Sequence, residues 1–182
     1  MSTLTDQPTN KNFLSQIGFK FTINKTPNIN YFVHRANLPG ISLGSADIQT
    51  PFSRIPIAGD HLTFDDLTIE FKVDEDMKNY VELYNWILAI GFPDNFDQYK
   101  EIDNQRSGPI SGNVNRMTGG GVYSDATLTI LSSAMNPIHH ITYNDCYPTS
   151  IGDLAFSAID TDVQYLTCSA TFRYRKFSIT TL

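Results

Sequence analysis

Asp60, His61, Asp65 and Asp66 lie close together in the chain and are residue types that could perform chemistry. Carboxylates and an imidazole could bind a metal ion or assist phosphoryl transfer, but such groups must converge from rigid elements. Adjacent Asp65 and Asp66 would point to opposite faces of a strand. Asp60 follows Gly59, which is typical of a turn. We therefore interpret the cluster as turn and strand-entry residues. A small metal-dependent hydrolase that uses Asp60, His61 and Asp65 is the alternative.

The other residues with reactive side chains form no recognisable site either. His139 and His140 would point to opposite sides of a strand, and His34 is isolated. Cys146 and Cys168 lack metal-ligand spacing, so we expect two buried free thiols. GxSxG, HExxH and a phosphate-binding glycine loop are absent from the sequence. We predict no catalytic residue, no metal and no cofactor, and hence a protein that is not an enzyme.

The composition indicates a chain that associates with other copies of itself. Its 182 residues are enough for one domain with a hydrophobic core. Charged residues make up only 18% of the chain, below the roughly 25% of an average soluble domain. A surface with so little charge is typical of an oligomer, because part of it becomes interface.

The charge balance argues against binding to nucleic acid. The formal net charge is −6, and no cluster of Lys and Arg is long enough to bind DNA by releasing counterions. An acidic protein could still let DNA pass without holding it. The polar N-terminus does not resemble a signal peptide, and the longest apolar run, WILAIGF, is too short for a membrane span. We expect no membrane anchor and a protein folded in a cytoplasm.

Alternating apolar residues predict six or seven antiparallel strands. The pattern predicts a strand over 17–23 and a partner for it over 31–36. The clearest strand is LTIEFKV at 67–73, and alternation resumes at 126–131 and 139–143. A Pro-Thr-Ser turn at 148–150 then precedes one long final strand over 164–179.

One amphipathic helix is predicted after residue 73. Its expected buried stripe follows helical spacing: Met77, Tyr80, Val81, Tyr84, Ile87 and Leu88. Asp74 can cap its N-terminus, and Gly91 and Pro93 end it. Trp86 lies off the stripe, so we expect it to face a second surface where a partner could bind.

Three segments carry no regular pattern. Residues 1–12 are expected to be a flexible arm before a single domain of residues 13–182. Residues 94–124 form a glycine-rich insertion. Residues 40–66 contain Pro51 and Pro56, which do not suit the middle of a sheet, so we expect a long apolar loop. That loop either folds over its own core or packs on a neighbouring subunit.

Several motifs resemble the tail tube proteins of contractile-tailed, T-even-type bacteriophages. The stretch RIPIAGDHLTFDDLTIEFKVDED is followed by a helix with a central Trp. NLPG lies upstream, and a PTS turn precedes a long strand rich in aromatic residues. The similarity covers most of residues 13–179, although the connection at 94–124 is longer than a minimal tube protein needs.

The resemblance implies a fold and an assembly. The fold is mainly β with one helix, an antiparallel sandwich or barrel of tail-tube type with long loops. Hexameric rings would join their inner strands into one barrel around a lumen for DNA and would stack through residues 44–60. The candidate contacts between subunits or rings are Phe52, Arg54, Ile55, Ile57, Asp60 and Trp86, with Arg54 and Asp60 in ion pairs.

The implied function is that of a structural subunit of the inner tail tube. Its partners would be other copies of the chain, the tail sheath, the baseplate, and viral DNA that passes without specific binding. It would be located in the virion tail after assembly in the host cytoplasm. The alternatives are a tube initiator or terminator of the same fold, or a tube subunit of a related bacterial injection system.

Overall fold

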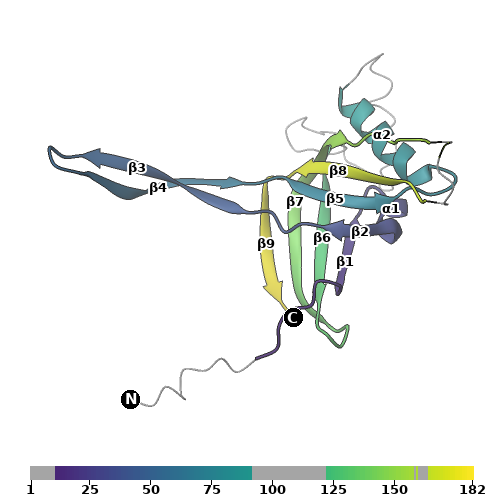
Figure 1. Cartoon of the computed structure of the whole chain (residues 1–182), viewed down its shortest axis with the longest axis horizontal. Helices are drawn as coiled ribbons and strands as arrows, with labels where there is room; N and C mark the ends of the chain where they lie inside the picture. The colour runs from purple at the N-terminus through teal and green to yellow at the C-terminus, as the bar shows by residue number, and fades with distance from the viewer. Residues whose placement is uncertain (1–10, 92–121, 158, 160–163) are drawn as a thin grey trace, which may run out of the picture.

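The computed structural model describes residues 11–91, 122–157, 159 and 164–182, and these are mostly antiparallel strands (Figure 1). A seven-stranded sheet forms the body, and a separate two-stranded hairpin extends from it. The prediction of a mainly β, antiparallel fold is confirmed. Two helices are present within the described residues, where one was predicted.

One half of the body is a sheet of four strands. In spatial order these are β1 (Phe19–Ile23), β6 (Ser124–Leu131), the first part of β7 (Pro137–Ile151) and β9 (Lys176–Thr181). The pairing aligns residues in rows across all four strands. One row is Phe21, Leu128, Ile141 and Ile179, and the next is Thr22, Thr127, Thr142 and Ser178. Because neighbours in a row share a face, the rows alternate between an apolar and a polar face.

The other half of the body continues from the end of β7. There β7 pairs with β8 (Thr167–Arg173), followed by β5 (Leu67–Lys72) and β2 (Val33–Ala36). Asp145, with φ of 56°, lies between the part of β7 that pairs with β9 and the part that pairs with β8. Aspartate tolerates this left-handed conformation better than most residues, so it can redirect the strand. One core joins the two halves.

Both helices lie at the end of the body away from the hairpin (Figure 1). They are α1 (Pro27–Phe32) and α2 (Lys78–Gly91). The predicted stripe of α2 is wrong, because its buried residues are Asn79, Leu83, Trp86 and Ala89. Helical spacing also fits this second set. Aromatic and polar residues on adjacent faces made the two sets hard to distinguish.

Trp86 belongs to the core, so the expected partner surface at this residue is wrong. Its side chain is 2% exposed and packs 6.2 Å from the Phe172 ring, centroid to centroid. Its indole N–H donates to the Val122 carbonyl at 2.9 Å. The Lys25 ammonium lies over the ring at 5.3 Å. Burying the largest side chain and satisfying its one donor outweighs the stripe that sequence spacing favoured.

The start of α2 is held by a residue that sequence analysis did not single out. Asn79 is fully buried, and its amide donates to the Lys72 carbonyl at 2.9 Å. Its side-chain oxygen accepts from the N–H groups of Asp74 and Tyr80. The predicted cap at Asp74 is therefore wrong, since the helix begins four residues later. A short polar side chain reaches these backbone groups more directly.

Two predicted strands and one predicted turn differ from the observed elements. Tyr31 and Phe32 end α1, and the following β2 pairs with β5 instead of with β1. The long strand predicted at 164–179 divides near Tyr174, because β8 and β9 pair with different parts of β7. The predicted turn at 148–150 lies within β7, where a register shift after Pro148 accommodates the proline.

The segment predicted as a loop at 40–66 is mostly a long β-hairpin. Its strands are β3 (Ile41–Gln49) and β4 (Arg54–Phe64), and Pro56 lies opposite Asp47. The Thr50 N–H donates to the Ser53 carbonyl, so the backbone groups of Ser53 point toward β3. Because backbone groups alternate in direction along a strand, the nitrogen of Pro56 points away from β3. Proline is tolerated there because β4 pairs on one side only.

Some predictions concern residues that the structure does not describe. Most of the glycine-rich segment 94–124 lies outside the described residues. Residues 1–10 do too, so the division into an arm of residues 1–12 and a domain of residues 13–182 stays a prediction. Among the helices in the described residues, none has the length and apolar character needed to cross a membrane.

Candidate assembly surfaces

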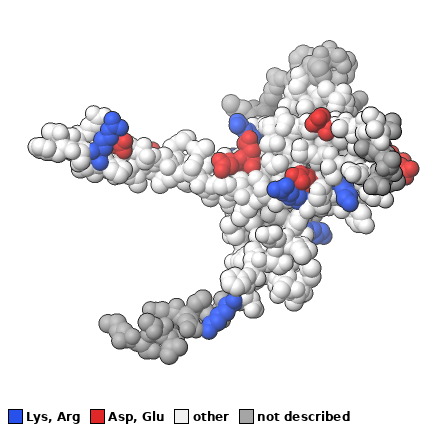
Figure 2. Space-filling model, in the orientation of Figure 1, with Lys and Arg blue, Asp and Glu red and all other residues white. Residues whose placement is uncertain are grey.

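The hairpin β3–β4 is the most exposed part of the described chain. It extends far from the body in Figure 1, and all its residues are exposed except half-buried Gly59 and Phe64. Its surface carries few charges (Figure 2). An isolated two-stranded hairpin is marginally stable in water. Because no other described segment covers its apolar side chains, this hairpin would gain stability from a partner.

The outer half of the hairpin has two chemically different faces. Ile48 lies opposite Ile55, and Ala46 opposite Ile57, so these four side chains share one face. The alternate pairs carry Asp47, Gln49, Arg54 and other polar or small residues on the opposite face. Such a pattern is typical of a strand pair with one buried face, although here no other described segment covers either face.

The inner half also has an apolar face, separated from the outer one by a glycine contact. Ile41 lies opposite Phe64, and Leu43 opposite Leu62. The register shifts beyond Leu43, where Gly44 and Gly59 approach closely. A Cβ atom added at Gly59 would lie 2.4 Å from the Gly44 carbonyl oxygen. Only glycine at position 59 allows this approach.

The base of the hairpin is held by aromatic rings. Phe64 packs 5.6 Å from Phe177 and 6.1 Å from Tyr174, centroid to centroid. Tyr143 lies beneath them, 5.1 Å from Tyr174. Burial, with the nearby Asp65 carboxylate, raises the pKa of Tyr174 to about 12. These rings fix the point from which the hairpin leaves the body.

Asp65 and Asp66 also stabilise this base. The Tyr174 hydroxyl donates to the Asp65 carbonyl at 2.9 Å, and Arg173 Nε lies 3.0 Å from an Asp66 carboxylate oxygen. Asp65 also donates its backbone N–H to the Gly40 carbonyl. Both residues occupy the connection between β4 and β5, as the predicted strand-entry role requires.

The rest of the sequence-predicted cluster lies on β4. Asp60 and His61 belong to this strand, so the predicted turn at Asp60 is wrong. The pairing with β3 shifts register beside Gly59. A Gly-Asp pair suits such a shift as well as it suits a turn, so the sequence did not distinguish the two. Among the described residues, no three His, Cys, Asp or Glu side chains gather closely enough to hold a metal ion.

The predicted contact residues of the hairpin lie along its outer half. Phe52 is 99% exposed at the tip, between Thr50 and Ser53, which hydrogen-bond to each other. Ile55 and Ile57 lie on the outer apolar face. Within the described residues, Arg54 and Asp60 form no ion pair inside the chain. Whether these residues contact another subunit stays a prediction.

Within the described residues, β1 and β9 each leave one edge of the four-stranded sheet without a partner strand, although at the end of the β1 edge the Asn30 side chain bonds the Ile23 N–H and carbonyl. On β9, Ile179 is 56% exposed, although the other members of its row are buried. The Leu182 N–H donates to the Ile138 carbonyl of β7. Because N–H groups alternate in direction along a strand, the Ile179 N–H points away from β7, to the free edge. Free edges are ready to pair with another chain. Alternation along the sequence does not reveal these edges, because it does not determine the order of the strands.

The polar face of the same sheet carries hydroxyl groups but no carboxylate across its central rows. Alternation along the sequence does not identify this face, because it does not determine the register between strands. Its members are Lys20, Thr22, Thr127, Thr129, His140, Thr142, Asn144, Lys176, Ser178 and Thr180. The Thr129 hydroxyl and His140 Nδ1 lie 2.9 Å apart. A polar face of this kind, with lysines on its two edge strands, is suited to water or to a passing solute.

The two cysteines are confirmed as buried free thiols. Burial raises the pKa of Cys146 to about 12 and also raises the pKa of Cys168. The thiol, and not the more reactive thiolate, is therefore the stable form of both.

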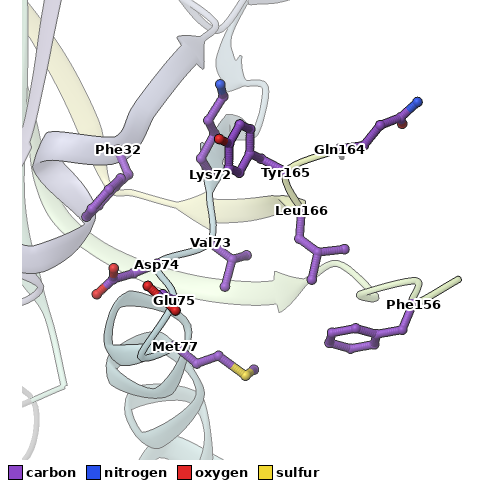
Figure 3. Close-up of a pocket in the computed structure, with 10 residues that line it drawn as sticks. All are labelled: Phe32, Lys72, Val73, Asp74, Glu75, Met77, Phe156, Gln164, Tyr165 and Leu166. Carbon is purple, nitrogen blue, oxygen red and sulfur yellow. The ribbon is translucent and has the colours of Figure 1, made fainter. Parts of the chain in front are cut away.

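A groove of about 720 Å³ lies where β5 meets α2 (Figure 3). Val73, Met77 and Leu166 form its apolar wall, and Lys72 lies over the Tyr165 ring. Phe156 and Gln164 also line it. Among its described lining residues, Lys72, Asp74 and Glu75 carry charges, and none of them forms an ion pair with another.

An exposed apolar hairpin and free strand edges are surfaces that another chain could cover. The family model for phage tail tube proteins matches residues 3–180, nearly the whole chain. The chain belongs to the phage tail tube protein family. This confirms the resemblance noted in the sequence. No curated protein matches the chain significantly.

Solved structures from contractile injection systems share the fold of this tail tube family member. A chain from the tube-terminating cap of the anti-feeding prophage aligns with a TM-score of 0.58 and 12% identity, over 100% of both chains. A chain from the extended sheath–tube complex of the extracellular injection system PVC gives 0.57 and 11%, covering 100% of this chain and 99% of that one. A chain from the anti-feeding prophage baseplate gives 0.52 and 12%, with 89% and 90% covered.

Proposed function

We propose that this chain is a structural subunit of the inner tube of a contractile phage tail. The observation that carries the proposal is the four-stranded sheet, which has an unpaired strand at each edge and a polar outer face. Membership of the tail tube family supports it. In this role the chain binds other protein chains and catalyses no reaction.

The two free edges favour closure into a ring. The β1 edge of one copy would pair with the β9 edge of the next, so that each copy extends the sheet of its neighbour. A ring of six copies would join their sheets into one barrel and leave no edge exposed. Pairing of unlike edges is a head-to-tail contact, which closes into a ring when the rotation per copy is right.

The polar face would then line the channel. Its threonine and serine hydroxyls offer no strong charge to a passing molecule. Lys20 and Lys176 are its only strongly basic residues, one on each edge strand. The acidic residues that give the net charge of −6 therefore lie elsewhere in the chain. The passage of DNA would depend on the neutral hydroxyl groups of this face more than on repulsion between carboxylates and phosphates.

The hairpin would connect successive rings. Its β4 strand has 11 residues and is about 36 Å long at ~3.3 Å per residue. The sheet of one copy is only about 19 Å wide at ~4.8 Å per strand. The tip therefore reaches past an adjacent copy, which leaves Phe52, Ile55 and Ile57 available to a subunit in the next ring. Arg54 and Asp60 would form ion pairs there.

The remaining partners follow from the place of such a tube. A sheath would surround it and a baseplate would support its end in the virion tail, after assembly in the host cytoplasm. A tube-terminating cap is the second candidate, because the cap protein of the anti-feeding prophage aligns over the full length of this chain. A tube subunit of a bacterial injection system would use the same surfaces.

Negative-stain electron microscopy of the purified protein over a range of concentrations tests the proposal. Six-fold rings that lengthen into hollow tubes are the expected result. Rings that never stack would favour the cap or initiator. A uniform particle without rings at every concentration would overturn the tube-subunit proposal.

A further inference from the structure

The free edge of β9 lies between two projections. The hairpin leaves the body at the beginning of β9, where Phe64 packs against Phe177. The segment of residues 11–17 leaves the sheet at the other end, because Phe19 shares its row with Thr181, the last residue of β9. In Figure 1 both projections extend toward the side of the molecule on which β9 is the outermost strand.

The segment 11–17 is unusually apolar for an exposed stretch. Phe13 is 97% exposed, Leu14 61% and Ile17 81%. The hairpin base resembles it, since Ile41, Leu43 and Leu62 are also exposed. With Ile179 between them, these side chains surround the β9 edge with apolar surface. A monomer that exposes such a surface needs a covering partner.

The opposite side of the molecule offers matching apolar groups at both ends of β1. Exposed Tyr31 lies on α1, which follows Ile23 at the end of β1. Ile23 shares its row with Phe177, which packs against the hairpin base. Exposed Met135 lies in the turn between β6 and β7, at the end of the sheet where residues 11–17 leave it. A second copy that pairs its β1 with β9 would bring Tyr31 to the hairpin base and Met135 to the segment 11–17.

We propose that residues 11–17 and the hairpin base clasp one and the same neighbouring copy, the copy whose β1 pairs with β9. The inference rests on the proposed ring. Each contact between neighbouring copies would then have three parts: the pair of strands β9 and β1, the hairpin base at one end of that pair, and residues 11–17 at the other end. The outer half of the hairpin takes no part in the clasp, because it extends beyond the width of that neighbour. Phe13, Leu14 and Ile17 thereby become assembly residues.

Photo-crosslinking tests whether both arms contact the same copy. A chain with a benzophenone amino acid at both Phe13 and Leu62 is diluted into a large excess of unlabelled full-length protein and allowed to form rings. Each labelled chain then has only unlabelled neighbours. Irradiation should give covalent dimers. Trimers would show that the two arms hold different copies, and rings that yield no crosslinked product would show that the arms are free; either result overturns the clasp.

A charge placed in the arm provides an independent measurement. Phe13→Asp should raise the protein concentration needed for rings at least tenfold, because the carboxylate would be buried against the neighbour. Gln16→Asp adds the same charge to an exposed position of the same segment and should leave that concentration unchanged. Equal effects of the two variants would contradict the clasp. If the unmodified protein forms no rings at all, the proposed function itself fails.

Discussion

Tyr143 and Tyr174 share one aromatic cluster, but their hydroxyl groups have different surroundings. The Tyr174 hydroxyl donates to the Asp65 carbonyl at 2.9 Å. The Tyr143 hydroxyl is buried and has no hydrogen-bond partner among the described residues. Tyr174→Phe should therefore lower the free energy of unfolding by about 1 kcal/mol, whereas Tyr143→Phe should raise it by about 1 kcal/mol. Urea denaturation of both variants checks the signs, and two losses of similar size would contradict this account.

The same two residues predict how stability depends on alkaline pH. Burial raises the pKa of Tyr174 from 10.0 to about 12, and it also raises the pKa of Tyr143. The unfolded chain therefore loses its phenolic protons first. The contribution of these two tyrosines to stability should be level below pH 10 and should fall as the pH rises toward 12. Urea denaturation midpoints across this range measure the fall, and Tyr174→Phe should make it shallower. A rise in stability over the same range would refute the assignment.

Asn79 provides a further residue-scale test. Its side chain makes three hydrogen bonds to the backbone around the start of α2 and is fully buried. Asn79→Ala leaves buried backbone groups without partners and should lower the free energy of unfolding by about 2 kcal/mol. Asn85→Ala changes an exposed residue of the same helix and should have an effect below about 0.5 kcal/mol. Similar losses in thermal or urea unfolding would argue against a structural role specific to Asn79.

At the scale of the element, the hairpin depends on its glycine contact. A Cβ at position 59 would meet the Gly44 backbone, whereas a Cβ at position 44 would find its nearest atom 3.6 Å away. Gly59→Ala should therefore distort the outer half of the hairpin and impair assembly, while Gly44→Ala should assemble normally. Sedimentation velocity over a concentration series measures both. Because the body does not rely on this contact, its urea unfolding should change by less than about 0.5 kcal/mol.

The two faces of the outer hairpin predict opposite responses to charge. Ile57→Asp places a carboxylate on the apolar face and should block stacking, with the fold of the body intact. Ala58→Asp adds the same charge one residue away, on the polar face, and should allow tubes to form. Tube lengths in electron micrographs provide the comparison. Tubes of normal length from the Ile57→Asp protein would remove the hairpin's apolar face from the stacking contact.

At the scale of the whole molecule, ring formation depends on the edge of β9. The Ile179 N–H points away from β7, so Ile179→Pro should remove an edge donor and preserve the sheet within the chain. Rings should be lost, while circular dichroism retains its β signal. Ile179→Ala keeps the N–H and serves as the control for the lost side chain. Rings of normal abundance from the proline variant would mean that the copies associate by another surface.

Much of this architecture could be predicted from the sequence, because local patterns determine local structure. Alternation in LTIEFKV located β5, and the change of period after it located α2, although not its buried face. The ordered motifs around residues 54–76 pointed to the tail tube family, which the family match confirmed. Residue types and spacing were enough because a half-buried strand and an amphipathic helix each impose a short period on the chain.

The tertiary structure alone decided which residues are available to other chains. Trp86 became buried through contact with a distant segment, and Asn79 through hydrogen bonds to the chain just before α2. Pro56 was accommodated because β4 has one partner strand among the described residues. The free edges of β1 and β9 and the hydroxyl-rich face also depend on pairing between strands far apart in the chain. Strand order and register arise from those long-range contacts, and a shift of one residue would exchange the two faces of a strand. The sequence therefore determined the class of protein, and the packing determined the surfaces with which it can assemble.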